Sequence, residues 1–307
     1  MPEAELHPTA ALVRRLLKAQ LPESLQALAA QPLGPVVQGW DNAMFRLGPS
    51  HVVRLPVRQA SVPCLTNEMR WTARAAAPLA VLGVETPRQV FHGRPGAGYH
   101  WPWAVTQWIE GEAVALLPVG RRDRLAPALA RALTALHRPA PQDAPHNPYR
   151  GVPLADRIRS VAERRPSVDA ALGAHRGEQL RRIVDDGLRA APWRRPPVWL
   201  HGDPHPWNLV HRQERLAGLI DFGDVCAGDP ASDLATAWLT LDAAQRSAFR
   251  DIADGSGRYD DDVWRRAAAW AAIYVTALVA DPASSQEFAG VVEHAVGQLV
   301  SLGGRSG

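Results

Sequence analysis

The stretch that decides the fold of this chain reads Val198-Trp-Leu-His-Gly-Asp-Pro-His-Pro-Trp-Asn-Leu-Val210, and its pattern continues to residue 233. Three short apolar runs with polar residues at their ends predict strands at residues 198–200, 209–210 and 216–220. Two prolines between Asp203 and Asn208 exclude a helix there and stiffen the loop. We therefore expect Asp203, Asn208 and Asp221 to converge on one rim of loops.

These three side chains are spaced as a phosphoryl-transfer site requires. Four residues separate Asp203 from Asn208. Asp221-Phe-Gly follows after a predicted hairpin. In such a site one carboxylate orients and deprotonates the attacking hydroxyl, while an amide oxygen and a second carboxylate hold Mg²⁺. The alternative is that Asp203 and Asn208 are turn formers and Asp221 closes a strand, which requires several spacings to coincide by chance.

The ordered motifs resemble those of the aminoglycoside phosphotransferase family, a branch of the protein-kinase-like fold. They are His201-Gly-Asp with Asn208, Ile220-Asp-Phe-Gly, and Gly228-Asp-Pro followed by Asp-Leu-Ala235, and the resemblance extends over residues 36–240. It implies an α+β, two-lobed fold with a small antiparallel-sheet N-lobe and a larger, mainly helical C-lobe. We expect a nucleotide-binding lobe over residues 1–108 and a catalytic and acceptor-binding lobe over residues 109–307.

The same resemblance implies a role for each motif residue. Asp203 would be the catalytic base, Asn208 and Asp221 would be the Mg²⁺ ligands, and ATP or GTP would lie between the lobes. The family also includes choline, homoserine, fructosamine and macrolide kinases. The motifs therefore define the reaction much better than they define the acceptor.

Composition excludes several other classes of protein. The chain has 307 residues, a net charge of +3 and interspersed acidic and basic residues, so nothing marks a nucleic-acid-binding surface. Cys64 and Cys226 are far apart, which argues against a disulfide framework or a zinc site. The longest apolar run, residues 267–280, is too short to cross a bilayer. We expect a cytoplasmic monomer or dimer that binds neither nucleic acid nor membrane.

Nearly all basic residues are arginines, and Lys18, on a predicted helix after Thr9, is the only lysine. A nucleotide-binding lysine is therefore not available. In the kinase-like pattern its place falls on Arg54 in the predicted strand 51–56, with Glu68 on the next helix as its partner. Arginine keeps the charge and can contact two phosphate oxygens. An exposed strand arginine and an exposed helix glutamate are the alternatives.

Two further segments are candidates for contact with the nucleotide. Gly39 and Asn42 lie in a turn between predicted strands that would cover the phosphates in a kinase-like fold, although an ordinary hairpin explains it equally well. The backbone from Gln107 to Ile109, at the end of the predicted strand 103–109, would meet the purine edge. Three nearby tryptophans are candidate cleft residues, with core packing as the alternative: Trp101, Trp103 and Trp108.

The rest of the chain is predicted to be mainly helical. The N-terminal segment before the first strand is predicted to end at Pro32 to Pro35. Helices are expected at residues 121–137, 154–163, 178–190, 231–241, 243–254, 260–280 and 284–302, with a disordered tail at 303–307. His201, Asp229 and Asp233 are interpreted as structural supports of the predicted site. A polycationic acceptor would require carboxylates in its pocket, for which the candidates are Asp224, Asp251, Asp254, Glu287 and Glu293.

The leading hypothesis is Mg²⁺-dependent transfer of a nucleotide γ-phosphate to a hydroxyl group of a small molecule. Among the possible acceptors, an antibiotic such as an aminoglycoside or macrolide is slightly favoured. The alternatives are a metabolite kinase of the choline, homoserine or fructosamine type, and a catalytically silent nucleotide-binding scaffold. A protein kinase is disfavoured because Gly228 follows Asp221-Phe-Gly223 within five residues, which leaves no room for a long activation loop.

Overall fold

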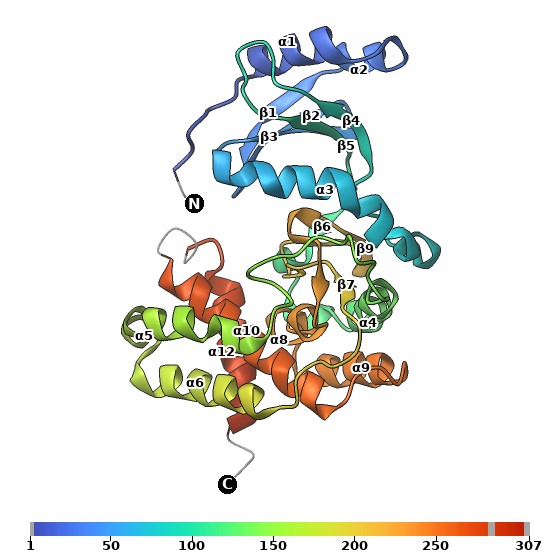
Figure 1. The fold of residues 1–307 in the computed structure, drawn as a ribbon. Helices are drawn as coiled ribbons and strands as arrows, with labels where there is room; N and C mark the ends of the chain where they lie inside the picture. Colours follow the sequence, from blue (N-terminus) through green and yellow to red (C-terminus); the bar gives the residue numbers. More distant parts are fainter. Residues whose placement is uncertain (1–2, 282–285, 304–307) are drawn as a thin grey trace.

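Two lobes make up the molecule (Figure 1). The structure, a computed structural model, describes residues 3–281 and 286–303. The upper lobe is built around an antiparallel sheet and the lower lobe is mainly helical. This confirms the predicted α+β, two-lobed architecture.

Five antiparallel strands form the N-terminal sheet in the order β1-β2-β3-β5-β4. They are β1 (Leu33–Gln38), β2 (Asn42–Leu47), β3 (His51–Pro56), β4 (Gln89–Gly93) and β5 (Trp103–Gln107). Helices α1 (Ala10–Gln20) and α2 (Gln26–Ala29) lie above the sheet, and α3 (Val62–Ala75) lies between the sheet and the lower lobe (Figure 1). Leu16 of α1 and Phe45 of β2 belong to one buried core that holds α1 on the sheet.

Helix α1 begins where the sequence predicts. The N–H of Leu12 donates to the side-chain oxygen of Thr9 at 3.3 Å, which satisfies one of the free donors of the first turn. Lys18 is exposed on this helix, at the far side of the N-lobe from the C-lobe.

The predicted ends of two strands were wrong. Residues 33–35 do not end a lead-in segment but already belong to β1. Pro35 is tolerated there because β1 is an edge strand with a register shift between Leu33 and Val36, so its missing N–H breaks no regular ladder. The end of β5 also differs, because this strand stops at Gln107 instead of Ile109, where its partner β3 begins at His51.

Helices of the C-lobe pack around the long, buried helix α10. The main helices are α4 (Leu125–Leu136), α5 (Ile158–Leu172), α6 (Ala174–Arg189), α9 (Ala243–Asp254), α10 (Asp261–Ala280) and α12 (Ala289–Gly303). Asp260 caps α10 by accepting from the N–H of Val263 at 3.0 Å, as its acidic start predicts. Small β-elements support the interlobe region: β6 (Glu112–Ala113), β8 (Leu209–Arg212) and β9 (Arg215–Leu219) form one sheet, and β7 (Val198–Leu200) pairs with β10 (Cys226–Gly228).

Several predicted helix boundaries were also wrong. Helix α5 runs on to Leu172 through Pro166, whose ring is on the exposed side while Val168 is buried. Helix α6 begins at Ala174, and the helix predicted over 231–241 is divided into α7 (Ala231–Leu234) and α8 (Thr236–Thr240). Helix α12 begins at Ala289. Residues 284 and 285 of the predicted helix and residues 304–307 of the predicted tail lie outside the described residues.

In the part of the chain that the structure describes, no helix has both the length and the apolar composition needed to cross a bilayer. Both cysteines there are free thiols. Cys226 is buried in β10, whereas Cys64 is partly exposed on α3.

Candidate functional site

The loop of residues 201–208, after strand β7, presents Asp203 and is held by a buried carboxylate of α7. Asp233 accepts hydrogen bonds from the backbone N–H groups of His201, at 2.7 Å, and Gly202, at 2.9 Å. Gly202 has a φ of +91°, and a Cβ there would lie 2.2 Å from the carbonyl oxygen of Asp224. Only glycine fits this close approach, so the glycine of the His-Gly-Asp sequence lets the loop pass against the backbone of Asp224.

His201 anchors the same loop through its ring, as the sequence analysis expected. Its Nε2 lies 2.9 Å from the carbonyl oxygen of Ile220, and its ring packs on Phe222 with centroids 4.4 Å apart. The ring is fully buried, and burial lowers the pKa of His201, which keeps it neutral at physiological pH. His201 therefore ties the 201–208 loop to the segment that carries Asp221.

Asp203 is held between two basic side chains. Its Oδ1 lies 3.1 Å from Nη2 of Arg150, and its Oδ2 lies 3.4 Å from Nε2 of His205. The side chain is 29% exposed. Burial opposes ionisation, but Arg150 and then His205 outweigh it and hold the pKa of Asp203 below its usual range. The carboxylate is thus ionised at neutral pH and fixed in orientation.

Arg150 is itself locked in place. Its Nε lies 3.2 Å from Oδ2 of Asp224, whose other oxygen accepts from Asn147 at 2.8 Å. The guanidinium lies over the ring of Tyr274, 4.9 Å from its centroid. The following residue, Gly151, accepts from the N–H of Asp229 at 2.9 Å, which pins this loop against the turn after β10.

Asn208 and Asp221 have side chains suited to a hard cation. The amide nitrogen of Asn208 donates to the carbonyl oxygen of Asp203 at 3.0 Å, so its amide oxygen points the other way and bonds to no described residue. Asp221 adopts a left-handed conformation with φ of 62°, and its carboxylate is 49% exposed. One carboxylate and one amide oxygen beside open space fit Mg²⁺, which keeps waters and nucleotide oxygens as its other ligands.

Arg54 and Glu68 form an ion pair beneath the N-terminal sheet. The guanidinium donates to Oε1 of Glu68, a fully buried side chain that also accepts from Gln89 at 3.1 Å. Nη2 of Arg54 reaches to 3.6 Å from Oδ1 of Asp221. Burial alone would lower the pKa of Arg54, but Glu68 and then Asp221 raise it. Neither surface alternative considered from the sequence therefore applies, because both side chains are buried.

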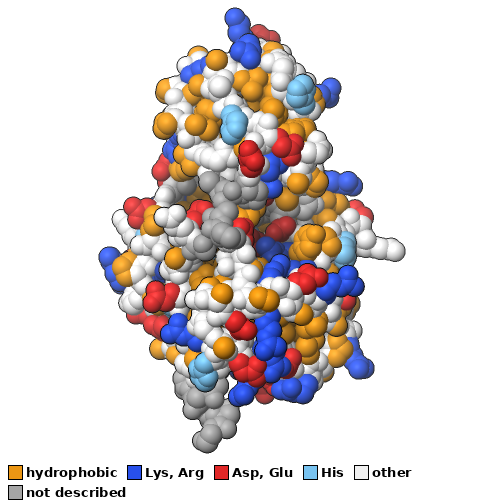
Figure 2. Space-filling view, turned by 90° about the vertical axis from the view of Figure 1, so that its left-hand side faces the viewer, with side chains coloured by type: hydrophobic (Ala, Val, Ile, Leu, Met, Phe, Trp, Pro, Cys, Tyr) orange, Lys and Arg blue, Asp and Glu red, His pale blue; other side chains and the backbone are white. Residues whose placement is uncertain are grey.

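A cleft of about 850 Å³ between the lobes brings most of the predicted site residues together, and Figure 2 shows the surface hollowed there. Those that line it are Gly39, Arg54, Gln107, Ile109, Asp203, Asn208 and Asp221. Two predicted residues do not line it. Asn42 is buried in the hairpin, where its carbonyl accepts from the N–H of Gly39 at 2.8 Å, and Glu68 lies behind Arg54.

The chain matches the profile of the phosphotransferase enzyme family over residues 33–270, more than three quarters of its length. It belongs to that family. The phosphotransferase is thus a small-molecule kinase in class, and the motifs quoted from the sequence all fall within the matched residues or at their margin.

Solved structures share the fold of this phosphotransferase at low identity. The GDP and kanamycin complex of APH(2″)-IIIa is 18% identical, with a TM-score of 0.66 over 96% of this chain and 99% of the other. The streptomycin and ATP complex of APH(2″)-IIa is 17% identical, with a TM-score of 0.56 over 96% and 99%. Macrolide 2′-phosphotransferase MphH from Brachybacterium faecium is 18% identical, with a TM-score of 0.56 over 90% and 95%.

Only some of the side chains left open by the sequence reach the cleft of the phosphotransferase. Asp224 and Glu287 line it, whereas Asp251, Asp254 and Glu293 do not. Among the tryptophans, Trp108 lines it beneath the guanidinium of Arg46, 4.0 Å from the ring centroid. Trp101 and Trp103 do not line it, and Trp103 is fully buried in the N-lobe core.

Sequence reasoning missed several cleft residues of the phosphotransferase, namely Arg150, Arg164, His205 and Tyr274. Arg150 lies in a polar, proline-rich segment between two predicted helices. No local pattern marks it, because its position depends on Asp224 and on the turn at Gly228, both more than 70 residues away. His205 lies two residues after Asp203 in the sequence, and this proximity was a signal for it.

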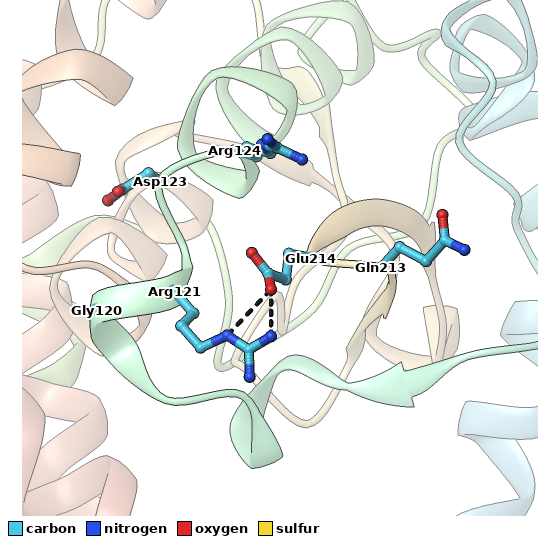
Figure 3. A pocket seen from close by; sticks show the side chains of 6 residues that line it. All are labelled: Gly120, Arg121, Asp123, Arg124, Gln213 and Glu214. Carbon is cyan, nitrogen blue, oxygen red and sulfur yellow. Dashed lines mark hydrogen bonds and ion pairs between the residues drawn. The ribbon is translucent and has the colours of Figure 1, made fainter.

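A second hollow lies on the lower lobe of the phosphotransferase and shares no residue with the cleft (Figure 3). Arg121 donates from Nε to Glu214 at 3.0 Å there, and both side chains are exposed to solvent. Its remaining lining residues are Gly120, Asp123, Arg124 and Gln213. An exposed pair of this kind stabilises little and performs no chemistry by itself.

Proposed function

We propose that this phosphotransferase catalyses Mg²⁺-dependent transfer of the γ-phosphoryl group of a nucleotide to a hydroxyl group of a small molecule. The observation that carries the proposal is the convergence of Asp203, Asn208 and Asp221 in one cleft, opposite the buried Arg54–Glu68 pair. Within this proposal, residues 1–108 bind the nucleotide, residues 109–307 supply the catalytic loop and the acceptor site, and the enzyme works in the cytoplasm.

The nucleotide, ATP or GTP, lies under the N-terminal sheet in this proposal. Arg54 contacts its phosphates with the guanidinium that Glu68 holds in place. Gly39 and Asn42 shape the turn over the phosphates through the hydrogen bond that closes it. Near the purine edge, the N–H of Gln107 already donates to Arg88 and the N–H of Trp108 to Ser50. The backbone of Ile109 bonds to no described residue. In this proposal it therefore contacts the purine, beside Gln107.

Asn208 and Asp221 are the proposed Mg²⁺ ligands. When bound, Mg²⁺ neutralises charge on the phosphate oxygens and favours transfer of the γ-phosphoryl group. The protein contributes the orientation of the ligands: Asp203 fixes the amide of Asn208 through its own carbonyl, and His201 fixes the backbone before Asp221. The described residues contain no cluster of three acidic, cysteine or histidine side chains that would form a cage for a cation without a nucleotide.

Asp203 acts as the base. Its carboxylate accepts a hydrogen bond from the acceptor hydroxyl, and the O–H proton passes to it as the new O–P bond forms. The bond between the γ-phosphorus and its bridging oxygen breaks, which releases the nucleoside diphosphate. Because Arg150 keeps Asp203 ionised and aimed, the orientation of the hydroxyl is the larger contribution of this residue.

Two classes of acceptor are compatible with this chemistry. Some of the similar solved structures are aminoglycoside and macrolide phosphotransferases, so an antibiotic of either kind is the first candidate. A metabolite of the choline, homoserine or fructosamine type is the second. One observation favours a metabolite over an aminoglycoside. Asp224 is already bound by Arg150 and Asn147, so its carboxylate is not available to bind a polycation.

The test is nucleoside diphosphate release from Mg-ATP and Mg-GTP across aminoglycosides, macrolides, amino alcohols and hydroxy acids. Acceptor-dependent release that Asp203→Asn abolishes would support the proposal. A silent nucleotide-binding scaffold would instead bind nucleotide in a direct titration and show no release above background with any acceptor. Such a result, with equal behaviour of wild type and Asp203→Asn, would refute the proposed activity.

A further inference from the structure

Two arginines on one face of α5 form no ion pair with any carboxylate in the part of the chain that the structure describes. Arg157 is the N-terminal cap residue of α5 and Arg164 follows seven positions later, so two helical turns place them on one face. Arg164 lines the cleft together with Arg150 and Tyr274. Both side chains are half-buried. Nε of Arg157 and Nη1 of Arg164 are inaccessible to solvent and hydrogen-bonded to no described residue.

Burial is the main cause that lowers the pKa of each of these two arginines. Arg157 is also repelled by Arg164 and Arg150. At Arg164 the attraction of the neighbouring Glu163 is larger than the repulsion by Arg150. By contrast, the exposed neighbour Arg165 on the same helix pairs with Asp169 at 3.5 Å.

Half-buried guanidiniums without a counter-ion are costly, because the loss of hydration is not compensated. Two guanidiniums on one helix face, that of Arg164 in the cleft wall and that of Arg157 over the ring of Tyr149 at 5.2 Å from its centroid, are the complement of an oxyanion. The carboxylates nearest to the reaction centre do not fill this role: Asp203 and Asp224 are both engaged by Arg150. Glu287 also lines the cleft, but it forms no ion pair with either arginine among the described contacts.

We propose that Arg157 and Arg164 bind an oxyanion, a carboxylate or phosphate ester, on the phosphate acceptor itself. This inference rests on the proposed function, which places the acceptor hydroxyl at Asp203. It defines the acceptor as a hydroxylated acid that enters with its anionic end toward α5. It also disfavours an acceptor that would place an ammonium group against Arg164.

Matched six-carbon polyols test the charge preference without the need to know the natural acceptor. Gluconate is anionic, sorbitol is neutral and glucosamine is cationic. Each is titrated calorimetrically into the wild-type enzyme saturated with Mg-ADP, so that the nucleotide phosphate positions are already filled. We expect gluconate to bind about tenfold more tightly than sorbitol, with glucosamine the weakest of the three.

The variant Arg157→Gln/Arg164→Gln should bring gluconate to the affinity of sorbitol and leave sorbitol unchanged. The control is Arg165→Gln, which removes a charge from the same helix and should keep the gluconate preference. Equal binding of gluconate and sorbitol by the wild type, or a preference that survives in the double variant, would overturn the inference.

Inorganic phosphate, titrated under the same conditions, separates an acceptor site from a general anion site. Phosphate should compete with gluconate but bind more weakly, since it lacks the carbon skeleton and the second hydroxyl contact at Asp203. Equal affinity for the two would overturn assignment of the site to the acceptor. Because all these titrations measure binding and not turnover, they remain decisive even if no compound is phosphorylated, which is the result that would refute the proposed activity.

Discussion

Nε2 of His137 lies 3.2 Å from Oδ2 of Asp233, the carboxylate that holds the 201–208 loop. The other ring nitrogen of His137 lies 2.8 Å from the hydroxyl of Tyr259, and both His137 and Asp233 are fully buried. The end of helix α4 is thus connected through one histidine to the start of α7 and to the backbone of His201. The loop that carries Asp203 is supported from three directions by groups that never touch a substrate.

Replacement of Asp233 by alanine should destabilise the enzyme. It leaves His137 and two buried backbone N–H groups without an acceptor, which corresponds to at least about 2 kcal/mol of unfolding free energy. Urea unfolding measures this loss. The exposed Asp143, which pairs with Arg74 at 3.3 Å, supplies the control, because Asp143→Ala should change stability by no more than about 0.5 kcal/mol. Equal effects of the two substitutions would show that the Asp233 contacts contribute little.

Replacement of Asp203 by asparagine should lower kcat by a factor of about 100 or more, because it removes the proposed base that orients the acceptor hydroxyl and accepts its proton. The affinity for Mg-ADP should stay close to that of the wild type, since Asp203 contacts Arg150 and His205 and not the nucleotide side of the cleft. Steady-state kinetics and a nucleotide titration measure the two effects. Turnover near the wild-type rate would remove Asp203 from its proposed role.

Replacement of Asp221 by asparagine should raise the Mg²⁺ concentration for half-maximal activity about tenfold or more, because one of the two proposed Mg²⁺ ligands loses its negative charge. Asp41 offers a matched control. It also lines the cleft, but its Oδ1 is engaged by Arg58 at 3.0 Å and Ser61 at 2.7 Å. Asp41→Asn should therefore leave the Mg²⁺ dependence unchanged. If both variants shifted it equally, general charge in the cleft would explain the effect instead of a ligand.

The Arg54–Glu68 pair separates stability from nucleotide binding. Glu68→Ala leaves a buried guanidinium with only the more distant Asp221 and should cost about 3 kcal/mol of unfolding free energy. Apolar replacement of both members, as Arg54→Met/Glu68→Leu, should recover most of that stability because no uncompensated charge remains. Nucleotide affinity should stay low in both variants. Recovery of nucleotide binding in the double variant would argue against Arg54 as the phosphate contact.

Cys64 should react slowly with iodoacetamide. Burial, followed by the charges of Asp41, Asp224 and Asp221, raises the pKa of its thiol to about 12. Since the thiolate is the reactive form and a raised pKa reduces its fraction, the alkylation rate should climb about tenfold per pH unit from pH 7 to 9.5 without a plateau. Mass spectrometry of the Cys64 peptide follows the reaction. A plateau near pH 8.5 would indicate an ordinary, accessible thiol.

The sequence was most informative where the functional residues lie close together along the chain. Asp203, Asn208 and Asp221 are separated only by a stiff loop and a hairpin, so their spacing predicted the meeting that the cleft shows. Arg54 and Glu68 were paired through the resemblance, and the structure places them in contact. The roles assigned to these residues stay predictions until the variants above are measured.

Long-range contacts explain most of what the sequence did not reveal. Arg150 reaches Asp203 because its loop is held by the turn at Gly228, and no periodic pattern encodes such a contact. Helix α5 continues beyond its predicted end because Pro166 lies on its solvent-exposed side. Which side of the helix is exposed depends on how the helix packs in the folded protein. Pro35 entered a strand because that strand is at the edge of the sheet. In each case the neighbours, and not the residue type, determined the outcome.

The position of Lys18 has a practical consequence for chemical labelling. It carries the only side-chain amine of the chain and is exposed on α1, on the opposite side of the sheet from the cleft. Amine-reactive dyes or surface-coupling reagents should attach there without contact with Asp203 or Arg54. Conversely, a reagent that acylates lysines from the proposed nucleotide site would meet the guanidinium of Arg54 there, which stays protonated. A lysine-directed survey of nucleotide-binding proteins would therefore miss this enzyme even when its site is full.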